Sequence, residues 1–593
     1  MPFDGLTIQA VTRELDSILV NGRIDKIHQP EKDEIILAIR TTGSGTVRLL
    51  ISANPRWARV HLLNNRKENP VTPPAFCMLL RKYLEGGKIK AVRQVGMDRV
   101  VHLVVEAMDD FREWREKLLV CEFMGRHSNI ILINPENNAI IDAIKKYGSD
   151  LSSYREVLPG KEYVTPPDQG KLNPLESSVE DFMNRIMGTN LNTSLAEALF
   201  AALAGVSPYS AGQFCTQAGI DPDTPLDQCG EYELTRVYQK MKTTLSSLVD
   251  GEYHPLVALG VNHQPLEFAP YPLEGLPAGS SGVECSTMNQ ACDLYFGKKL
   301  EVQQLNSMKS NLSKHIKGFL DRLYRKRFLQ EGDQVRARDS EVYKDWGELL
   351  TAYAHQLNKG DREAVLDDFY SGEKVIIPLE PRFAPIQNAQ KYFKVYNKSR
   401  KTLRHLEHLM AQNQEEIDYL ETVMVTIQQA ESRDEIFEVI EELEKEGYLK
   451  ERSQRRQRKL LKSQPRRFMS SEGLEILVGR NNRQNDTLTL RQANPYDLWL
   501  HTQKIPGTHV IIRMQPNNGD INLVPDSTLE EAASLAAYFS QAENSSKVPV
   551  DYTFKINVRK PGGAKPGMVI YDNYWTIYVN PQDERVKRLL SGL

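Results

Sequence analysis

Residues 403–427, LRHLEHLMAQNQEEIDYLETVMVTI, carry the pattern that decides the architecture of this chain. Its apolar residues recur at alternating steps of three and four, which is a heptad seam with Asn413 as its one polar member, a usual way to fix register. A less regular apolar series lies on an earlier helix, from Val302 to Leu323, and only about 75 residues separate the two. We therefore predict an antiparallel coiled-coil hairpin with a middle helical segment, residues 286–446, rather than a dimer zipper. The seam consists of Leu403, Leu406, Met410, Asn413, Ile417, Leu420, Met424 and Ile427.

The charges along this hairpin are polarised. Residues 309–327 contain seven basic residues and one acid, and residues 391–404 add six basic residues and no acid. Residues 407–446 reverse the balance, with thirteen acids against two basic residues. A solvated coiled-coil face explains any such run, but the division also lets the basic half meet RNA while the acidic half avoids it.

A basic linker, residues 447–467, follows the hairpin. Its stretch 450–467 holds nine Lys or Arg against one Glu. This density favours contact with nucleic acid, although a disordered linker could have the same composition.

Length and composition set further bounds. A chain of 593 residues has room for about three to five domains. The 75 basic residues nearly balance the 78 acidic ones, which excludes a protein that coats nucleic acid by bulk charge. Six scattered cysteines without a C-x-x-C pair support neither a disulfide scaffold nor a zinc knuckle. The first residues do not resemble a signal peptide, and no apolar run is long enough to span a membrane. We therefore expect a cytoplasmic protein.

Residues 1–170 predict a strand-rich domain. Helical spacing marks a first helix at about 6–20, and Pro73-Pro74 opens a second helix that ends before Gly86-Gly87. Eight short apolar runs around these helices indicate strands. The combination is typical of an α+β sandwich or barrel, and spacing does not decide between the two.

Residues 178–250 predict a helical domain. They contain the turn Leu203-Ala-Gly-Val-Ser-Pro208, followed by Ala218-Gly-Ile220. A helix, a turn at Gly205 and a second helix make a helix-hairpin-helix pattern. The free backbone N–H groups of such a turn can face a phosphate, because glycine lets the backbone approach closely. A helix pair that binds nothing has the same pattern.

Residues 468–593 predict a separate α/β domain. A strand at 474–478 ends in Gly479, further strands surround the Pro506-Gly507 turn, and Ser527 to Glu530 has the form of a capping box that starts a helix. Three more strands complete a mostly antiparallel sheet. The whole chain is thus an α+β multidomain protein.

The last domain also carries motifs that resemble those of the NFACT family. The resemblance continues in the N-terminal block and before the seam, in the same domain order, so it covers nearly the whole chain. The family usually has a Lys before the Thr-Ile-Tyr-Val strand, where this chain has Trp575. The motifs are Ile476-Leu-Val-Gly-Arg-Asn-Asn482, Gln484-Asn-Asp486, Asp497-Leu-Trp-Leu-His501, Pro506-Gly-Thr-His509, Lys560-Pro-Gly-Gly-Ala564, Pro566-Gly-Met-Val569, Asp98-Arg99, Glu122-Phe-Met-Gly-Arg-His-Ser-Asn129 and Asn388-Ala-Gln-Lys-Tyr-Phe-Lys-Val-Tyr396.

The resemblance, closest to bacterial RqcH-like members, implies a function in ribosome-associated quality control. Such proteins bind obstructed large (50S) ribosomal subunits that still carry peptidyl-tRNA, and they recruit charged tRNA, alanyl-tRNA in bacteria. They support elongation without mRNA, and the resulting C-terminal alanine tail marks the chain for degradation. The ribosome performs the peptidyl transfer, so the resemblance implies a tRNA-handling factor and not an enzyme. It also implies a small S4-like RNA-binding helper, a monomer on the ribosome, an N-terminal domain similar to that of formamidopyrimidine-DNA glycosylases, and no cofactor.

The family's Asp-Arg pair, linked to tRNA binding, matches Asp98 and Arg99. A guanidinium can pair with a phosphate or a guanine edge, while Asp98 accepts from a base amine or orients the Arg. An intradomain salt bridge is the structural alternative. Arg126, His127 and Asn129 form a polar cluster at a turn, and we assign them to tRNA as well, with a purely structural turn as the alternative.

A second set of predicted contacts lies in the last domain. Arg480, Asn481 and Asn482 offer several donors on one loop, suited to rRNA or tRNA; asparagines that cap a turn are the alternative. His501 and His509 with Asp497 make only a weak metal site, because no cysteine is near and eight residues separate the histidines, so no metal is expected.

Two other classes of function stay open. A DNA glycosylase or AP lyase would use an N-terminal Pro amine with an adjacent Glu; here Pro2 is followed by Phe3 and the acid is Asp4, and the cysteines give no zinc finger. A surface fibronectin-binding adhesin is the other alternative, because relatives of this kind have been described in that way.

Overall fold

The computed structural model describes residues 3–43, 45–109, 111–150, 154–260, 263–368, 371–450, 463–514 and 521–591. It divides into two compact units, Met1–Val302 and Gln303–Leu593. Most of the predicted basic linker, residues 451–462, lies outside the described residues, as does Pro2.

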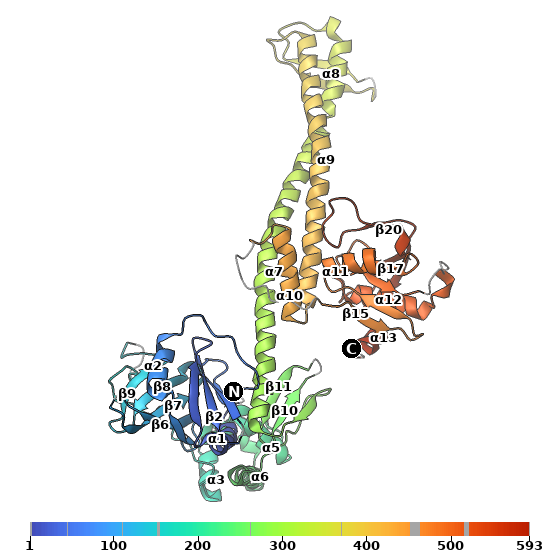
Figure 1. The fold of residues 1–593 in the computed structure, drawn as a ribbon. Coiled ribbons are helices and arrows are strands. Elements are labelled where there is room, and N and C mark those ends of the chain that lie inside the picture. Colours follow the sequence, from blue (N-terminus) through green and yellow to red (C-terminus); the bar gives the residue numbers. More distant parts are fainter. Residues whose placement is uncertain are drawn as a thin grey trace. The chain divides into compact units, whose positions relative to one another are not determined.

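A nine-stranded antiparallel sheet forms the N-terminal part of unit 1 (Figure 1). Its order is β4-β3-β2-β1-β5-β6-β7-β8-β9, so two meanders join where β1 pairs with β5. Helix α1 buries Val11, Leu15 and Leu19 in a core that both meanders share. The elements are α1 Gly5–Leu19, β1 Arg23–His28, β2 Glu34–Thr41, β3 Gly45–Ser52, β4 Arg59–Leu62, α2 Ala75–Leu84, β5 Lys88–Gln94, β6 Val100–Met108, β7 Trp114–Glu122, β8 Asn129–Asn134 and β9 Ala139–Ala143.

Four helices follow in unit 1 and share a second core, built around Phe182, Leu199 and Phe214. Residues 251–285, for which we predict no regular element from the sequence, contain a three-stranded sheet in the order β11-β10-β12. Its strands of four or five residues lie between prolines and glycines, which hid them in the sequence. The elements are α3 Val179–Met187, α4 Leu195–Ala202, α5 Pro208–Gln217, α6 Glu231–Asp250, β10 Leu256–Leu259, β11 Pro265–Ala269 and β12 Ser281–Glu284.

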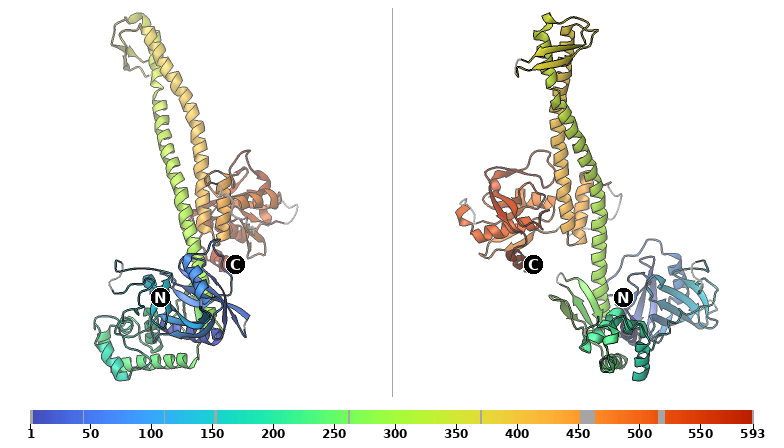
Figure 2. Two further views of the ribbon diagram at one scale, coloured as in Figure 1. Left: turned by 60° about the vertical axis from the view of Figure 1, so that its left-hand side comes forward. Right: turned by 180° about the vertical axis from the view of Figure 1, so that it is seen from behind.

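Two long helices of unit 2 form the predicted antiparallel hairpin (Figure 2). Lys309 Nζ donates to the Gln428 carbonyl at 2.9 Å, whereas Asn413 Nδ2 donates to the Leu323 carbonyl at 3.1 Å. Residue numbers therefore rise along one helix as they fall along the other, which confirms the antiparallel pairing. A third helix adds Ile436, Val439 and Leu443 to the same core. The elements are α7 Met288–Asp339, whose first residues belong to unit 1, α9 Pro385–Gln429 and α10 Arg433–Lys445.

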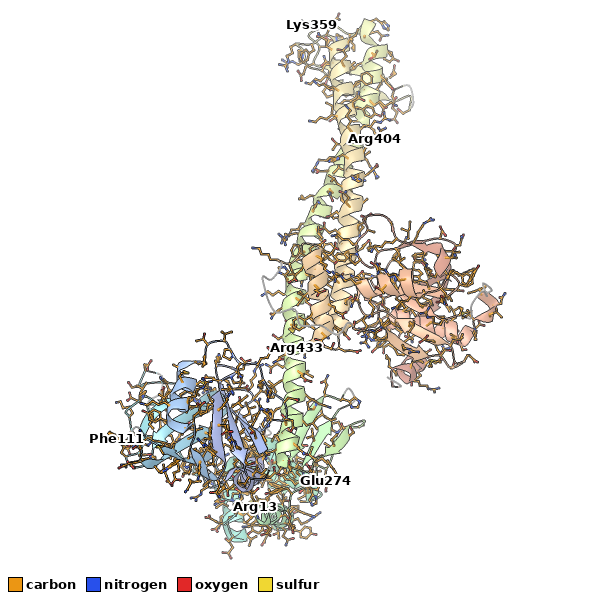
Figure 3. All side chains as sticks on the ribbon, viewed as in Figure 1. Arg13, Phe111, Glu274, Lys359, Arg404 and Arg433 are labelled. Atoms are coloured by element: carbon orange, nitrogen blue, oxygen red, sulfur yellow. The ribbon has the colours of Figure 1, made fainter. Side chains whose placement is uncertain are left out.

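The tip of the hairpin corrects the prediction of a wholly helical middle segment. It contains helix α8, Val342–Ala352, and a two-stranded sheet of β13, Glu363–Asp367, and β14, Lys374–Pro378. Figure 3 marks the tip at Lys359 and the shaft at Arg404. Alternate residues such as Ala364 and Ile377 are buried while their neighbours are exposed, which is a strand period that the helical interpretation missed.

The C-terminal domain of unit 2 is built on a six-stranded sheet in the order β15-β16-β18-β17-β19-β22. Helix α12 packs on one face, and Leu488, Trp499 and Val558 form a core on the other. The predicted capping box is wrong, because α12 begins at Asp526 with Pro525 as its N-cap and no side-chain cap. The α+β fold class is confirmed. The elements are β15 Arg466–Met469, β16 Glu475–Val478, α11 Asn482–Thr487, β17 Leu498–Thr502, β18 Val510–Ile512, α12 Asp526–Tyr538, β19 Val548–Phe554, β20 Val558–Arg559, β21 Ile570–Tyr571, β22 Trp575–Val579 and α13 Glu584–Ser591.

Candidate nucleic-acid interface

A pocket of about 790 Å³ in unit 1 brings together residues that the sequence placed in separate motifs. Asp98 and Arg99 line it from the β5–β6 turn, His127 from the turn after β7, and Gly205 from the α4–α5 turn. Its size falls within the range of small-molecule sites, so one nucleotide fits. We call this cavity the N-terminal pocket.

Two glycines and one carboxylate fix the α4–α5 turn against α1. The N–H of Gly5 donates to the Gly205 carbonyl at 2.8 Å, and Gly205 adopts φ +73°. A Cβ at Gly205 would lie 2.5 Å from the Met97 carbonyl oxygen, so only glycine fits. Asp4 accepts from the N–H groups of Thr7 and Ser207 at 3.0 and 3.3 Å and so holds the first turns of α1 and α5 together.

This network bears on the glycosylase alternative. Asp4 is buried and also accepts from the Ser210 hydroxyl, so its carboxylate is fully used in joining two helices. A carboxylate committed in this way is not available to assist an N-terminal amine. Nothing in the described part of the chain favours the glycosylase reading.

The Asp98–Arg99 turn presents its side chains at the entrance of β6. The Asp98 carboxylate accepts from the Arg99 N–H at 2.7 Å, and the Arg99 carbonyl accepts from the Phe123 N–H at 2.8 Å. Asp98 is exposed and Arg99 is half-buried. The backbone of the pair is therefore fixed on both sides while the side chains reach the pocket.

A second cation faces the same pocket. Lys171 donates to the Phe200 carbonyl at 2.6 Å, and its Nζ lies 4.3 Å from the Phe200 ring centroid. Burial, and then the positive charge of Arg99, lower the pKa of Lys171. Two cations that raise each other's energy in a half-enclosed site favour an anion between them.

The remaining wall is aromatic and was missed in the sequence. Tyr147, Tyr154 and Arg155 line the pocket beside Phe200. Arg155 is held from behind by the buried Glu122, with two contacts of 2.7 and 2.6 Å. The signal was the interleaving of Lys and Arg with Tyr between residues 145 and 155, a composition suited to nucleotide stacking.

The three residues after β7 that the sequence predicted to bind tRNA have two different environments. Gly125 adopts φ +60° in a tight turn, and Arg126 donates to His127 at 2.9 Å, with both side chains exposed. Asn129 is 1 % exposed; its side chain donates to the Lys145 carbonyl and accepts from the Lys145 and Ile130 N–H groups. Asn129 thus joins strands inside the protein, and we leave it out of the proposed RNA surface.

The predicted contacts of the C-terminal domain face α10 instead of open solvent. Arg480 Nη1 lies 3.1 Å from Glu431 and 2.7 Å from Glu435. Asn481 donates to Glu438 at 2.6 Å, and Asn482 donates to Glu442 at 3.0 Å. Asn481 also caps α11 by accepting from the Gln484 N–H, which was the structural alternative for this loop.

These carboxylates form one row, which we call the carboxylate ladder: Glu431, Glu435, Glu438, Glu442 and Glu446. Glu435, Glu438 and Glu442 share one face of α10, while Glu431 precedes the helix and Glu446 is its C-cap. Arg466 of β15 and Lys565 extend the contact, 3.1 Å from Glu431 and 2.7 Å from Glu446. The acidic run of the hairpin therefore holds the C-terminal domain.

The pKa shifts of two ladder members, Glu442 and Glu431, have opposite directions. Burial raises the pKa of Glu442, although Asn482 and the Tyr419 hydroxyl donate to it. At Glu431 burial also raises the pKa, but the charges of Arg466 and Arg480 outweigh it, and the net shift is downward.

The two histidines considered for a metal are packed together in the C-terminal domain. Their ring centroids are 5.5 Å apart, and burial lowers the pKa of both His501 and His509. Within the described residues there is no group of three or more His, Cys, Asp or Glu side chains placed to hold a metal ion. The helices of the described chain likewise include none that is long and apolar enough to cross a membrane.

Comparison with known families covers almost the entire chain. Residues 4–462 match the NFACT N-terminal and middle domains, and residues 464–573 match the NFACT protein RNA binding domain. The chain is 35% identical over 593 residues to the Rqc2 homolog RqcH of Bacillus subtilis, covering 99% of this chain and 100% of that protein. A shorter stretch of 85 residues, 14% of this chain and 8% of that protein, is 33% identical to the ribosome quality control complex subunit NEMF homolog of Drosophila melanogaster.

Solved structures resemble parts of the chain. The N-terminal part of the fibronectin/fibrinogen-binding protein of Streptococcus suis is 30% identical, with a TM-score of 0.41, and covers 50% of this chain and 99% of that one. The MutM (Fpg) protein of Thermus thermophilus is 13% identical with a TM-score of 0.22, over 42% of this chain and 77% of that one.

Proposed function

The chain belongs to the NFACT family, and from this premise we propose that it acts in ribosome-associated quality control by bringing charged tRNA to obstructed large ribosomal subunits. Its relatives carry ribosome quality control in their names, and its C-terminal domain matches an RNA binding domain. Both findings support an RNA-binding factor of the quality-control machinery.

The observation that carries the tRNA step is the N-terminal pocket. Arg99, Lys171 and His127 face a cavity that also has aromatic walls and the first turn of α5. The cations favour a phosphate, while Tyr154 and Phe200 offer faces to a base. We assign the pocket to an unpaired nucleotide of the tRNA. Arg99 is the main residue that binds this nucleotide, and Asp98 either orients Arg99 or accepts a hydrogen bond from the base.

The remaining steps follow from the family. The bound subunit is a 50S particle with peptidyl-tRNA, the recruited tRNA is alanyl-tRNA, and a C-terminal alanine tail is added without mRNA and marks the product for degradation. In this scheme the ribosome transfers the peptide, and this chain works as a cytoplasmic monomer with a small S4-like helper. The basic stretches of the hairpin, residues 309–327 and 391–404, supply contacts to ribosomal RNA.

The test is to purify the full-length protein from its own cells and to sequence the RNA that accompanies it. We expect large-subunit rRNA with one enriched tRNA species and little small-subunit rRNA. RNA at the level of a control purification would contradict the proposal, and enrichment of a tRNA other than an alanine tRNA would contradict its alanine part.

A paired change sharpens this test. Asp98→Ala with Arg99→Ala should remove the tRNA and lower its measured affinity by about 100-fold, since a bidentate Arg contact contributes about 1–3 kcal/mol and both groups are lost. Arg93→Ala is the matched control, because Arg93 is exposed on the adjoining strand β5 but does not line the pocket. Equal tRNA recovery from the double variant and the control would overturn the assignment of the pocket.

A further inference from the structure

The C-terminal domain contacts the hairpin through β15, the loop after β16 and Lys565, and β22 forms the sheet edge opposite β15. Arg466 lies on the first edge strand, β15, and Arg480 follows its neighbour β16; both pair with the carboxylate ladder. The strand at the other edge is β22. The loop at residues 480–482, which the sequence predicted to bind RNA, already contacts carboxylates. If this domain binds RNA, it needs another surface for that purpose.

Strand β22 and the residue before it, Tyr574, present aromatic side chains to solvent. Tyr574 is 48 % exposed and Tyr578 is 60 % exposed, and Thr576 lies between them. Because side chains alternate along a strand, residues 576 and 578 share one face, and a ring contact of 5.3 Å places Tyr574 beside Tyr571 on that side. We call Tyr571, Tyr574, Thr576 and Tyr578 the tyrosine edge.

The tyrosine edge rests on a fixed polar base. Asp551 of β19 is 1 % exposed and accepts from the hydroxyls of Tyr571 and Thr576 at 2.8 and 2.6 Å. Gln503 donates to the same carboxylate at 3.0 Å. The buried carboxylate thus fixes the side chains of Tyr571 and Thr576, and the Tyr571 ring in turn contacts that of Tyr574.

A cation completes the surface. Lys547 Nζ lies 4.8 Å from the centroid of the Tyr578 ring, in the strand register where Pro549 faces Tyr578. Lys547 is exposed, so its ammonium can reach a phosphate while the ring supports a base. Aromatic side chains on a sheet face with a cation at the rim are the means by which several domains bind single-stranded RNA.

We propose that the tyrosine edge, with Lys547, is a binding site for single-stranded RNA, whose bases stack on Tyr574 and Tyr578. The site lies in unit 2 and is separate from the N-terminal pocket, so it does not depend on the tRNA assignment. Trp575 is on the opposite face of the same strand, stacked on Tyr552 at 5.6 Å on the side of α12, and we leave it out of the site.

The experiment measures binding of a fluorescent oligouridine strand and of a short RNA duplex to the full-length protein. Tyr574→Ala with Tyr578→Ala should weaken oligouridine binding by about 10-fold to 100-fold and should change duplex binding far less. Tyr574→Phe with Tyr578→Phe keeps the rings and should keep most of the affinity. Trp575→Leu is the control for the opposite face and should bind as the unchanged protein does.

Salt dependence separates stacking from charge. The double alanine variant should lose affinity at every salt concentration with an unchanged slope of log K against log salt. Lys547→Gln should lower the magnitude of that slope by about 0.7, the value for one phosphate contact on a single strand. Thermal unfolding of each variant checks that the domain is folded.

Several results would overturn the proposal. Unchanged oligouridine binding of a folded double alanine variant would exclude the site, and an equal loss in the phenylalanine pair or in Trp575→Leu would show that stacking on this face is not the cause. Altered self-association without altered RNA binding would assign the edge to a protein strand. Arg99→Ala, measured alongside, should lower tRNA binding and leave oligouridine stacking intact, so the two proposals fail separately.

Discussion

The N-terminal pocket and the loop at residues 480–482 contain the same kinds of side chain, yet the protein uses them differently. In the pocket, Arg99 and Lys171 line one cavity, and burial together with the charge of Arg99 lowers the pKa of Lys171. In the loop, Arg480 meets two carboxylates of the carboxylate ladder, and the neighbouring asparagines meet two more. Burial beside another cation raises the energetic cost of both positive charges, whereas Arg480 lies within ion-pair distance of two carboxylates. Residue type alone therefore does not distinguish a binding surface from an internal contact.

The largest effect on stability is expected at Gly205, which lines the N-terminal pocket. Gly205→Ala adds a Cβ 2.5 Å from the Met97 carbonyl oxygen at a φ of +73°, so we expect a loss of about 3 kcal/mol in the free energy of unfolding of unit 1. Urea unfolding, with hydrogen exchange of α5 as the local report, measures it. Gly212→Ala on α5 is the control, because the added methyl meets nothing nearer than Pro222 at 3.8 Å and alanine favours a helix. Equal stability of the two variants would show that the turn does not depend on glycine.

The next effect is expected at Arg480. Arg480→Ala leaves Glu435, whose side chain is 10 % exposed, without its guanidinium, and should destabilise the attachment of the C-terminal domain by about 2 kcal/mol. Arg483→Ala is the control, since its pair with Glu441 is largely solvated and contributes about 0.5 kcal/mol or less. Hydrogen exchange of the amides in β15 and β16 measures the destabilisation in both variants.

RNA binding is the second readout of that experiment. We expect the tRNA affinity of Arg480→Ala to stay that of the unchanged protein. A tenfold loss of RNA binding without faster amide exchange in β15 would contradict this expectation. It would show that the loop at residues 480–482 binds RNA.

The smallest effect is a pH dependence of stability that has opposite signs at Glu442 and Glu431. The folded-state pKa of Glu442 is raised, so the folded protein binds more protons there, and stability falls as the pH rises from about 4.5 through the folded value. Glu442→Gln should therefore gain stability relative to the unchanged protein as the pH rises. The pKa of Glu431 is lowered, so its contribution is present above about 4.5 and is lost as the pH falls through the folded value.

Glu431→Gln should consequently lose stability relative to the unchanged protein as the pH rises. Denaturant unfolding at about pH 4 and about pH 8 measures both differences. The same sign in both variants would contradict the distinction between a carboxylate dominated by burial and one dominated by arginines.

The fold could be predicted where the periodicity was long. The seam around Asn413 and the first helix needed only helical spacing, and both are present. Strands of four or five residues, such as β10 and β13, were missed because a helix or a loop can contain so short an apolar alternation. The secondary structure of those segments depends on tertiary packing, which a local sequence pattern does not contain.

The residues of the candidate site also differ in how far the sequence could predict their environment. Asp98 and Arg99 could be located from their motif, because a turn at a strand end exposes its side chains. The partner of Arg480 could not, because Glu435 lies 45 residues away in sequence on another helix. The spacing of the ladder was readable as one helix face, but the sequence did not say what covers that face. Asn129 looked like a donor for RNA, and only its burial shows that the backbone of β8 and Lys145 already use it.

Helix α9 also has a consequence for the spacing of groups within unit 2. It runs unbroken for 45 residues, from the tip sheet to the turn before α10, so at 1.5 Å per residue it spans roughly 68 Å. Contacts at its two ends are then joined by a stiff spacer of one length. Once one end is bound, the other is confined to a narrow shell around its target, which raises its local concentration without any new contact. If both ends bind one particle, as the proposed function requires, a particle with its two targets at a different separation gains nothing from that arrangement.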